Sequence, residues 1–255
     1  MNAKRNIKLL LAFDGTGYEG WQKQKSGKTI QGVIEDRLSV MTGEQPCIYG
    51  AGRTDAGVHA LGMVANFHTD AKIPCQGFMR GLNSMLPDDI RVLEACEVQS
   101  DFHARRNAKA KSYRYNFSSG PVQFPTERLY SVHISKDLDI EAMKNGLGCL
   151  VGTYDYTSFE GAGSREPEVT GKGAVRTIFE ASLHAVGTDG NHRIIIKGDG
   201  FLRHMVRNIV GTVFEIGKGK LSPIDIIAIL AAKDRSAAGP TAPARGLFLK
   251  EVFYS

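Results

Sequence analysis

Apolar runs of strand length alternate with helical spacings through the first hundred residues of the chain. Four segments have the length and apolar content of β-strands: Ile7–Phe13, Cys47–Tyr49, Val58–Phe67, which Gly62 interrupts, and Arg91–Val98. Between them, apolar residues recur at helical spacing after Thr29, which can cap a helix, and again before Pro87, which stops one. The order strand, helix, strand, strand, helix, strand is that of a split βαβ, or ferredoxin-like, unit.

A related order returns in the second half of the chain. The predicted strands are Lys111–Phe117, Val175–Val186, Arg193–Lys197 and Leu247–Tyr254. The predicted helices are Leu138–Leu150, Leu202–Ile216 and Leu221–Lys233, the last with Ser222 as its cap and Pro223 in its first turn. Residues 160–174 and 236–246 are predicted loops because Gly, Pro, Ala and charged residues dominate them.

These patterns together predict an α+β protein built from two ferredoxin-like (split βαβ) units. The first unit is predicted to be residues 1–106 and the second residues 107–255, with the boundary near Arg105–Lys111. We expect a mixed, mostly antiparallel sheet with helices on one side and a basic cleft between the units.

Composition excludes several classes of protein. The chain has 255 residues, of which 42% are hydrophobic and 23% charged, and this excludes a disordered chain, a coiled coil and a collagen. The 32 Lys and Arg residues against 27 Asp and Glu residues give a formal net charge of +5. This modest surplus of base permits a polyanionic partner.

The N-terminal segment and the cysteines predict a cytoplasmic protein. Basic residues precede the apolar run Ile7–Phe13, as in a secretory signal, but Asp14 follows at once and no small-residue cleavage pattern comes before the glycine cluster. No apolar stretch approaches the roughly 18 residues that cross a bilayer, so we expect no membrane association. No CxxC pair is present, so we predict neither a zinc site nor a disulfide framework, but reduced, mostly buried thiols at Cys47, Cys75, Cys96 and Cys149.

Two glycine motifs resemble nucleotide-binding signatures but lack the required context. GTGYEG at residues 15–20 follows a strand, yet residues 21–27 have no helical apolar spacing, and Asp14 puts a negative charge where a pyrophosphate would lie. GKT at residues 27–29 resembles the end of a phosphate-binding loop, yet Gln22 occupies the position of its first glycine. We therefore expect no nucleotide cofactor and interpret the segment as a turn in a functional loop.

The stretch AGRTDAGVHA, residues 51–60, is the most informative in the chain. Asp55 is separated by one residue from Arg53 in a tight loop of Gly and Ala at a strand end, where small neighbours let a large substrate approach the carboxylate. A nearby guanidinium favours the ionised carboxylate, which is then available as a nucleophile or base. The same residues also fit a polar turn with a surface ion pair, because Asp and Arg are common in turns.

The segment DFHARRNAKAKSYRYNF, residues 101–117, interleaves basic side chains with the rings of Tyr113, Tyr115 and Phe117. Cations for phosphates and flat rings for bases are what single-stranded or flipped nucleotides require. The candidates for contact with an RNA backbone are Arg105, Arg106, Lys109 and Lys111. The alternative is a solvated basic linker that leads into a strand whose aromatic residues are core.

A third segment, FLRHMVRNIVG at residues 201–211, predicts a helix with its apolar positions in the core. Arg203 and Arg207 are four residues apart and would share a face, where they could contact phosphates, pair with a carboxylate such as Asp55, or be solvated. No group of His, Cys and Asp has metal-ligand spacing, and no serine nucleophile elbow is present.

Taken together, these segments closely resemble the tRNA pseudouridine synthase A family. The matching segments occur in order along nearly the whole chain: FDGTGYEGWQ, TIQGVIEDRL, AGRTDAGVHA, DFHARRNAKAKSYRY, FLRHMVRNIVG and GLFL. The stretch just before Val175 is less like the family pattern. The resemblance implies isomerisation of uridine to pseudouridine in the tRNA anticodon stem–loop, at tRNA positions 38 to 40, by a homodimer whose clefts receive RNA.

The resemblance also implies roles for individual residues. Asp55 would be the essential carboxylate, and Arg53 would help to hold the target nucleotide out of the stack. Tyr113 would stack on the flipped base or assist proton transfer, Arg207 would pair with Asp55, and Leu247 would be an apolar wall of the pocket. Extruding a base from a stem costs roughly a few kcal/mol, and an aromatic platform returns about 1–3 kcal/mol.

The implied reaction agrees with these residue types. The bond between uracil N1 and ribose C1′ breaks, and the base rotates and rejoins through C5, so nothing is oxidised and neither a cofactor nor a metal is needed. Asp55 would attack C1′ or remove the 2′ proton, and both routes stay open. The competing hypotheses are a non-catalytic RNA-binding module and an oxidoreductase that binds a nucleotide cofactor through the glycines of residues 15–20.

Overall fold

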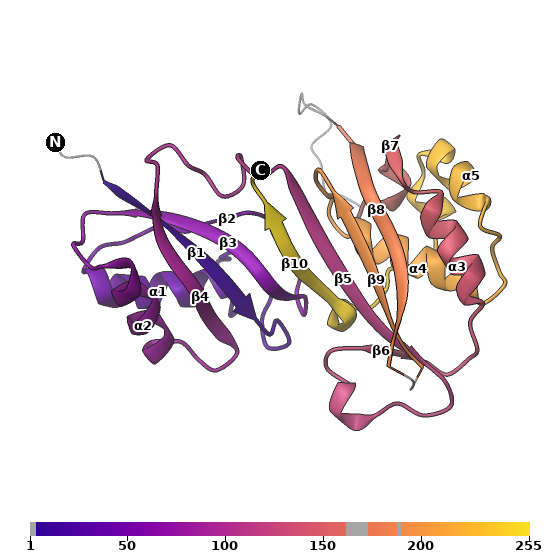
Figure 1. Ribbon diagram of the computed structural model, residues 1–255, viewed down its shortest axis with the longest axis horizontal. Coiled ribbons are helices and arrows are strands. Elements are labelled where there is room, and N and C mark those ends of the chain that lie inside the picture. Colours follow the sequence, from indigo (N-terminus) through magenta and orange to yellow (C-terminus); the bar gives the residue numbers. More distant parts are fainter. Residues whose placement is uncertain (1–3, 162–172, 188–189) are drawn as a thin grey trace. The chain divides into compact units, whose positions relative to one another are not determined.

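The computed structural model describes residues 4–161, 173–187 and 190–255, which form two compact units (Figure 1). Unit 1 comprises Met1–Lys109 with Phe248–Ser255, and unit 2 comprises Ala110–Leu247. The last strand therefore returns to unit 1, whereas the sequence prediction kept residues 107–255 together. The reason is a long-range pairing: β10 (Leu247–Phe253) runs parallel to β3 (His59–Thr69), with Phe248 opposite His59.

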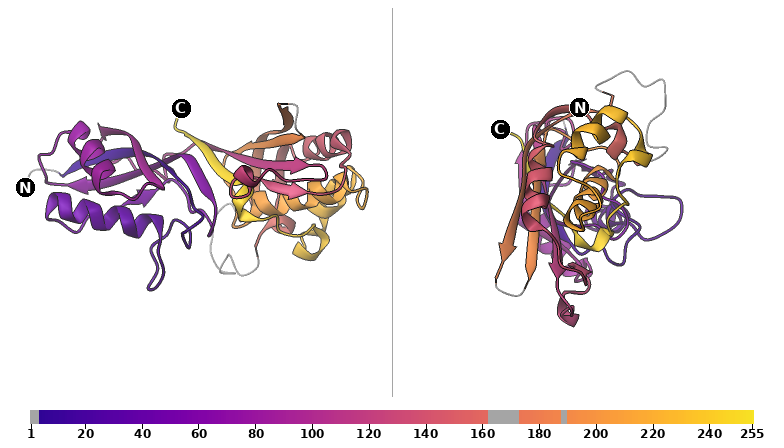
Figure 2. Two further views of the ribbon diagram at one scale, coloured as in Figure 1. Left: turned by 90° about the horizontal axis from the view of Figure 1, so that it is seen from below. Right: turned by 90° about the vertical axis from the view of Figure 1, so that its right-hand side faces the viewer.

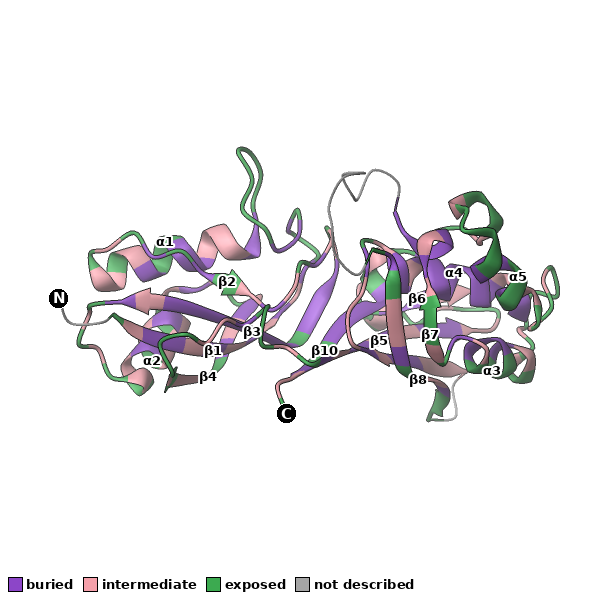
Figure 3. Ribbon diagram, turned by 90° about the horizontal axis from the view of Figure 1, so that it is seen from above, coloured by how far each residue is buried: buried purple, intermediate pink, exposed green. Residues whose placement is uncertain are grey.

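Unit 1 consists of a sheet and two helices. Besides β3 and β10, its strands are β1 (Arg5–Phe13), β2 (Tyr49–Gly50) and β4 (Ile90–Val98). Neighbouring strands follow the order β4-β1-β3-β10, and the short β2 also pairs with β3. In the middle of β1 every second residue, Ile7, Leu9 and Leu11, is fully buried, so one face of the strand enters the core (Figure 3).

The first helix of unit 1 begins, and the second ends, where the sequence predicts. α1 (Ile30–Thr42) is capped by Thr29, whose hydroxyl accepts a hydrogen bond from the Gly32 N–H at 3.3 Å. α2 (Cys75–Met85) ends two residues before Pro87. The Phe78 ring of α2 contacts Phe67 of β3 edge-on at 5.4 Å, which seats the helix on the sheet.

Unit 2 consists of strands in a sheet and three helices, which lie on one face of these strands (Figure 2). Its strands are β5 (Ala110–Ser119), β6 (Val132–Ile134), β7 (Gly152–Asp155), β8 (Val175–Val186) and β9 (Asn191–Gly198). Neighbours follow the order β5-β9-β8-β7, and β6 lies parallel to β5. Its helices are α3 (Ile140–Gly148), α4 (Met205–Gly217) and α5 (Asp225–Ala232). Short 3₁₀ turns are Pro125–Glu127 (η1), Thr157–Phe159 (η2), Arg235–Ala237 (η3) and Ala244–Gly246 (η4).

The helix-covered face of β5 confirms that part of the predicted aromatic cluster is core. Tyr115 and Phe117 are fully buried. Their rings meet Phe214 of α4 at centroid distances of 5.9 and 5.1 Å. The chain thus has the predicted α+β class, with mixed sheets and helices packed against them.

Some local predictions are wrong for identifiable reasons. β3 is not broken at Gly62, although its register with β1 shifts between Ala60 and Met63. A Cβ at Gly62 would lie 2.7 Å from the Lys250 carbonyl oxygen, so the glycine allows β10 to approach. α5 begins at Asp225 instead of Leu221, and Ser222 does not cap it: the Ser222 N–H donates to the Asp225 carboxylate at 2.7 Å. The predicted loop at 160–174 lies mostly outside the described residues.

The expectation of mostly buried cysteines is also wrong. Cys47 is exposed, and the other three, Cys75, Cys96 and Cys149, are partly accessible. These three lie at the ends or edges of elements, where side chains are less covered. Cys75 is the first residue of α2, Cys96 is on the edge strand β4, and Cys149 follows the last residue of α3. Within the described ranges, no helix has the length and apolar content to span a bilayer.

Candidate functional site

The Asp55 loop, residues 51–58, connects β2 to β3 in unit 1. It starts at a hydrogen bond from the Ala51 N–H to the Val64 carbonyl (2.8 Å) and closes with one from the Val58 N–H to the Asp55 carbonyl (3.1 Å). Within the loop, Thr54 is buried between the exposed Arg53 and the half-buried Asp55. The two charged side chains predicted to act together therefore stand on the accessible side of the same loop.

The glycine segment, residues 14–21, lies directly on the Asp55 loop. Two main-chain hydrogen bonds join them. The Trp21 N–H donates to the Thr54 carbonyl at 3.1 Å, and the Gly57 N–H donates to the Tyr18 carbonyl at 3.3 Å. Gly20 has a φ of +96°, and a Cβ there would lie 2.5 Å from the Thr54 oxygen. Glycine at this position thus allows two backbones to approach closely, and no helix follows the glycine segment until α1 begins at Ile30.

Two buried aromatic side chains anchor the glycine segment to the body of unit 1. Tyr18 is 4% exposed and its hydroxyl donates to the Asp89 carboxylate at 2.5 Å. Burial raises the pKa of the Tyr18 phenol far above its ordinary value, and the Asp89 carboxylate adds to this. Trp21 is buried next to Gly50, where a Cβ would lie 2.5 Å from the indole ring.

His59 joins three parts of unit 1 and was given no role by the sequence analysis. Its ring stacks on Phe248 of β10 with centroids 4.6 Å apart. Its Nδ1 lies 3.1 Å from the Gly15 nitrogen and 3.0 Å from the Asp14 carboxylate oxygen. The motif AGRTDAGVHA holds a signal for this role, because it places a histidine at the start of a buried strand. A buried polar ring needs hydrogen-bond partners.

The remaining predicted site residues belong to unit 2. Tyr113 of β5 is 8% exposed, and its ring meets Phe201 edge-on at 5.0 Å. In the first turn of α4, the Arg207 Nε–H donates to the Ala242 carbonyl at 2.7 Å, and the Ala242 N–H donates back to the Arg207 carbonyl at 3.0 Å. This pair of bonds brings Arg207 to the segment that leads into Leu247, which is buried.

Arg203 does not share a helix face with Arg207, so that prediction is wrong. His204 adopts a left-handed conformation with φ of +60°, and α4 begins only at Met205. Arg203 is exposed outside the helix, and its carbonyl accepts a hydrogen bond from the Gly161 N–H at 2.8 Å.

A buried amide supports the first turn of α4. Asn208 is fully buried, and its Nδ2 donates to the Phe159 carbonyl at 2.8 Å. Its Oδ1 accepts from the Thr241 hydroxyl at 2.6 Å and from the Arg235 guanidinium at 3.1 Å. The next residue after Arg207 therefore ties α4 to the same loop that Arg207 contacts. Sequence reasoning missed it because an Asn in a helix pattern shows no partner.

The basic candidates are divided between the units. Arg105, Arg106 and Lys109 are exposed in the stretch of unit 1 that leads into unit 2, whereas Lys111 is half-buried on β5 of unit 2. Over the described part of the chain, no three His, Cys, Asp or Glu side chains are grouped so that they could hold a metal ion.

Comparison with known proteins assigns this chain to a class of RNA-modifying isomerases. The family model described as tRNA pseudouridine synthase matches residues 10–106 and 149–255, and the chain therefore belongs to that family, whose enzymes convert uridine to pseudouridine. The match includes the Asp55 loop and Arg207 but not Tyr113.

Individual relatives are similar along almost their whole length. The protein named tRNA pseudouridine synthase A 1 of Desulfotalea psychrophila is 54% identical over 251 residues, covering 98% of this chain and 100% of the relative. The protein named tRNA pseudouridine synthase A of Acetivibrio thermocellus is 47% identical over 252 residues, with the same coverage.

Proposed function

We propose that this protein isomerises uridine to pseudouridine at positions 38, 39 and 40 of the tRNA anticodon stem–loop. Asp55 acts on the ribose of a uridine that has been flipped out of the helix. The observation that carries this proposal is the Asp55 loop itself: a carboxylate and an arginine on the accessible side of a loop whose backbone is held by the glycine segment. Membership in the family supplies the reaction class.

The proposed chemistry is an internal exchange of bonds. The bond from uracil N1 to ribose C1′ breaks, the base turns, and a bond forms between C5 and C1′. The proton on C5 is lost and N1 gains one, so atoms and electrons balance without an external group. Asp55 starts the exchange either by attack on C1′ or by removal of the 2′ proton, and a rigid loop favours both routes because it holds the carboxylate in place.

The other residues are proposed to hold the nucleotide. The exposed Arg53 keeps the base out of the stack, and Arg207 pairs with the Asp55 carboxylate. The hydrogen bond from Nε of Arg207 to Ala242 supports this role because it fixes the plane of the guanidinium. Leu247 forms an apolar wall. A base that stacks on Tyr113 must first uncover that ring, because only 8% of the residue is exposed.

At the level of the fold, we propose that both units are variants of the ferredoxin-like unit and that tRNA lies in a basic cleft between them. The order of neighbours β4-β1-β3 within unit 1, with a helix after β1 and another after β3, supports the first part. The exposed Arg53, Arg105 and Arg106 support the second. We also propose a cytoplasmic homodimer.

The test is to incubate the purified protein with an unmodified tRNA transcript and to map pseudouridines by position. The wild-type protein should modify positions 38 to 40, and Asp55→Asn should lower the rate by roughly a thousandfold or more, as expected for loss of an essential catalytic group. RNA affinity should persist, because the substitution removes a charge that repels phosphate. Asp101→Asn, the same change at an exposed aspartate of unit 1, should leave the rate unchanged.

Full turnover by Asp55→Asn would refute the assigned role. Salt-sensitive RNA binding without any isomerisation by the wild type would instead favour the non-catalytic binding module. A substrate deuterated at the ribose 2′ position separates the two routes: a primary isotope effect on turnover favours proton removal, and its absence favours attack at C1′.

A further inference from the structure

A pair of aromatic rings, one exposed and one half-buried, lies on unit 1 outside the site described above. Tyr49 of β2 is 41% exposed, and its ring centroid is 5.1 Å from that of His103, with the two planes 39° apart. We call this pair the Tyr49–His103 platform. Unlike the other ring pairs of unit 1, it joins a strand next to the Asp55 loop to the basic turn at residues 102–107.

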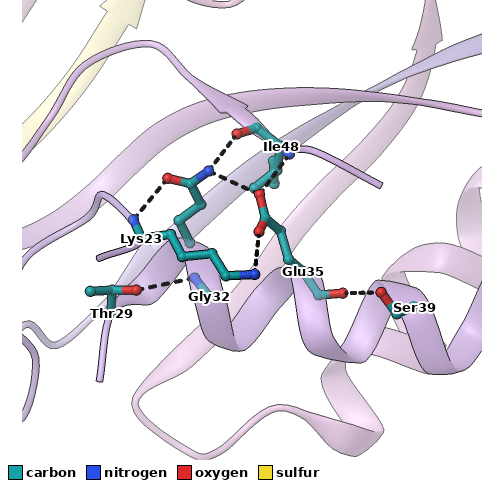
Figure 4. A network of polar contacts seen from close by, with 7 residues as sticks. Lys23, Thr29, Gly32, Glu35, Ser39 and Ile48 are labelled. Atoms are coloured by element: carbon teal, nitrogen blue, oxygen red, sulfur yellow. Dashed lines mark hydrogen bonds and ion pairs between the residues drawn. The ribbon is translucent and has the colours of Figure 1, made fainter. Parts of the chain in front are cut away.

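The main chain at Tyr49 is fixed by contacts with β3 and with α1. It pairs with Asn66 of β3 in the register of the sheet. Ile48, the residue before it, donates its N–H to the Glu35 carboxylate at 3.1 Å and accepts at its carbonyl from the Gln31 amide at 3.3 Å (Figure 4). Glu35 itself is only 8% exposed. The strand that presents the Tyr49 ring is therefore clamped by two side chains of α1.

His103 is held as firmly and in one tautomer. Its Nδ1 accepts a hydrogen bond from the Arg105 N–H at 3.1 Å, so its proton is on Nε2 when the ring is neutral. Its own N–H donates to the Asn107 side chain at 2.7 Å. Burial, helped by the charge of Arg106, lowers the pKa of His103 and so favours the neutral ring.

Both halves of the platform are tied to one buried residue, Asn66, whose main chain pairs with Tyr49 and whose side chain bonds to the turn of His103. Asn66, which pairs with Tyr49, also accepts a hydrogen bond at its Oδ1 from the Ala104 N–H at 2.8 Å. Its Nδ2 donates to Asn6 at 2.9 Å, and Asn66 and Asn6 are almost completely buried. A preorganised pair of rings loses little conformational entropy on binding a ligand.

The surroundings of the platform favour an anionic ligand with flat groups. Arg105 and Arg106 are exposed in the same turn as His103, and the charge of Arg106 is close enough to act on Tyr49. Rings for stacking and arginines for phosphates are the combination that binds single-stranded nucleic acid.

We propose that Tyr49 and His103 form a stacking platform for an unpaired RNA base near the target uridine, with Arg105 and Arg106 on the phosphates that flank this base. Tyr49 is six residues before Asp55, so their Cα atoms are at most ~22 Å apart even along an extended chain, a span of a few nucleotides. This inference rests on the proposed function, because it takes the ligand to be the substrate tRNA.

The test compares Tyr49→Ala, Tyr49→Phe and the control Tyr154→Ala, which truncates a tyrosine of equal exposure, 41%, in unit 2. Loss of one stacked base predicts that Tyr49→Ala raises both Kd and KM for an unmodified tRNA transcript by about tenfold, with kcat within about twofold of wild type. Tyr49→Phe keeps the ring and should behave as wild type, as should Tyr154→Ala. Wild-type Kd and KM in Tyr49→Ala would overturn the proposal, and so would a loss confined to kcat.

A second measurement does not depend on any variant being folded. A tRNA transcript carrying 5-iodouridine in place of uridine is irradiated in complex with the wild-type protein, and cross-linked peptides are identified. Cross-links to Tyr49 or His103 support the platform, and cross-links only to other segments overturn it. Failure of the proposed function is recognised separately, because the wild-type protein would then form no pseudouridine in an unmodified transcript, whether or not it binds it.

Discussion

The Asp55 loop of unit 1 and the start of α4 in unit 2 each present a charged side chain, but they are held by different kinds of contact. In unit 1, main-chain hydrogen bonds from Trp21 to Thr54 and from Gly57 to Tyr18 join two stretches of backbone. In unit 2, Asn208 joins the helix to its neighbouring loop through side-chain bonds to Arg235 and Thr241.

The difference determines which substitutions each region tolerates. Where two backbones are in contact, there is no space for a Cβ, so a substitution that adds a methyl group disrupts the contact. Where a buried amide makes the contacts, loss of its polar atoms does harm because its partners stay buried without a hydrogen bond. The two regions are therefore predicted to fail under opposite kinds of mutation.

The largest expected effect is that of Gly20→Ala. Its Cβ would collide with the Thr54 oxygen at 2.5 Å, and φ of +96° strains any side chain, so the loop that carries Asp55 must shift. Because a misplacement of about 1 Å can cost about 100-fold in rate, we expect kcat/KM on tRNA to fall by about 100-fold. Steady-state pseudouridine formation is the measurement.

Gly17→Ala is the matched control, because a Cβ at Gly17 would have no neighbour within 4 Å and the φ of Gly17 lies outside the left-handed region. It should keep its activity within about twofold. Equal losses in the two variants would show that close approach at Gly20 does not hold the Asp55 loop.

The second effect in size is that of Asn208→Ala on stability. It removes the hydrogen bonds to Phe159, Thr241 and Arg235 in a fully buried place. We expect the free energy of unfolding to fall by about 2–3 kcal/mol, measured by urea denaturation. Asn145→Ala, at an exposed position of α3, should change it by less than about 0.5 kcal/mol. A loss for Asn208→Ala as small as that of the control would contradict the buried-amide account.

The smallest effect concerns the charge near the Tyr49–His103 platform. His103 should titrate, by NMR, below the ordinary histidine pKa of about 6.5, and Arg106→Gln should move this pKa upward because it removes a repelling positive charge. Between the lowered pKa and about 6.5, the unfolded chain binds more protons than the folded one, so His103 makes stability rise with pH in that window and not above it. An unchanged pKa in Arg106→Gln would exclude Arg106 as a cause.

Much of the local structure could be predicted because its causes are close in sequence. The Thr29 cap of α1, the end of α2 before Pro87 and the buried alternation of β5 each depend on residues within one turn or one strand. The Asp55 loop was recognisable for the same reason, since its charges and its small residues are contiguous. Family membership, which the comparisons confirm, rests on these same short segments.

The rest depended on which parts of the backbone come together. Nothing local shows that β10 returns to β3, that Gly20 and Gly62 face another main chain, or that Asn66 supports both Tyr49 and His103. Hydrogen bonding and close approach between distant segments are decided by the whole fold, whereas caps and periodicity are decided by neighbours along the chain. For that reason the sequence alone predicted Asp55 as the reactive carboxylate and identified the family, and only the tertiary structure revealed how the loop that carries Asp55 is held.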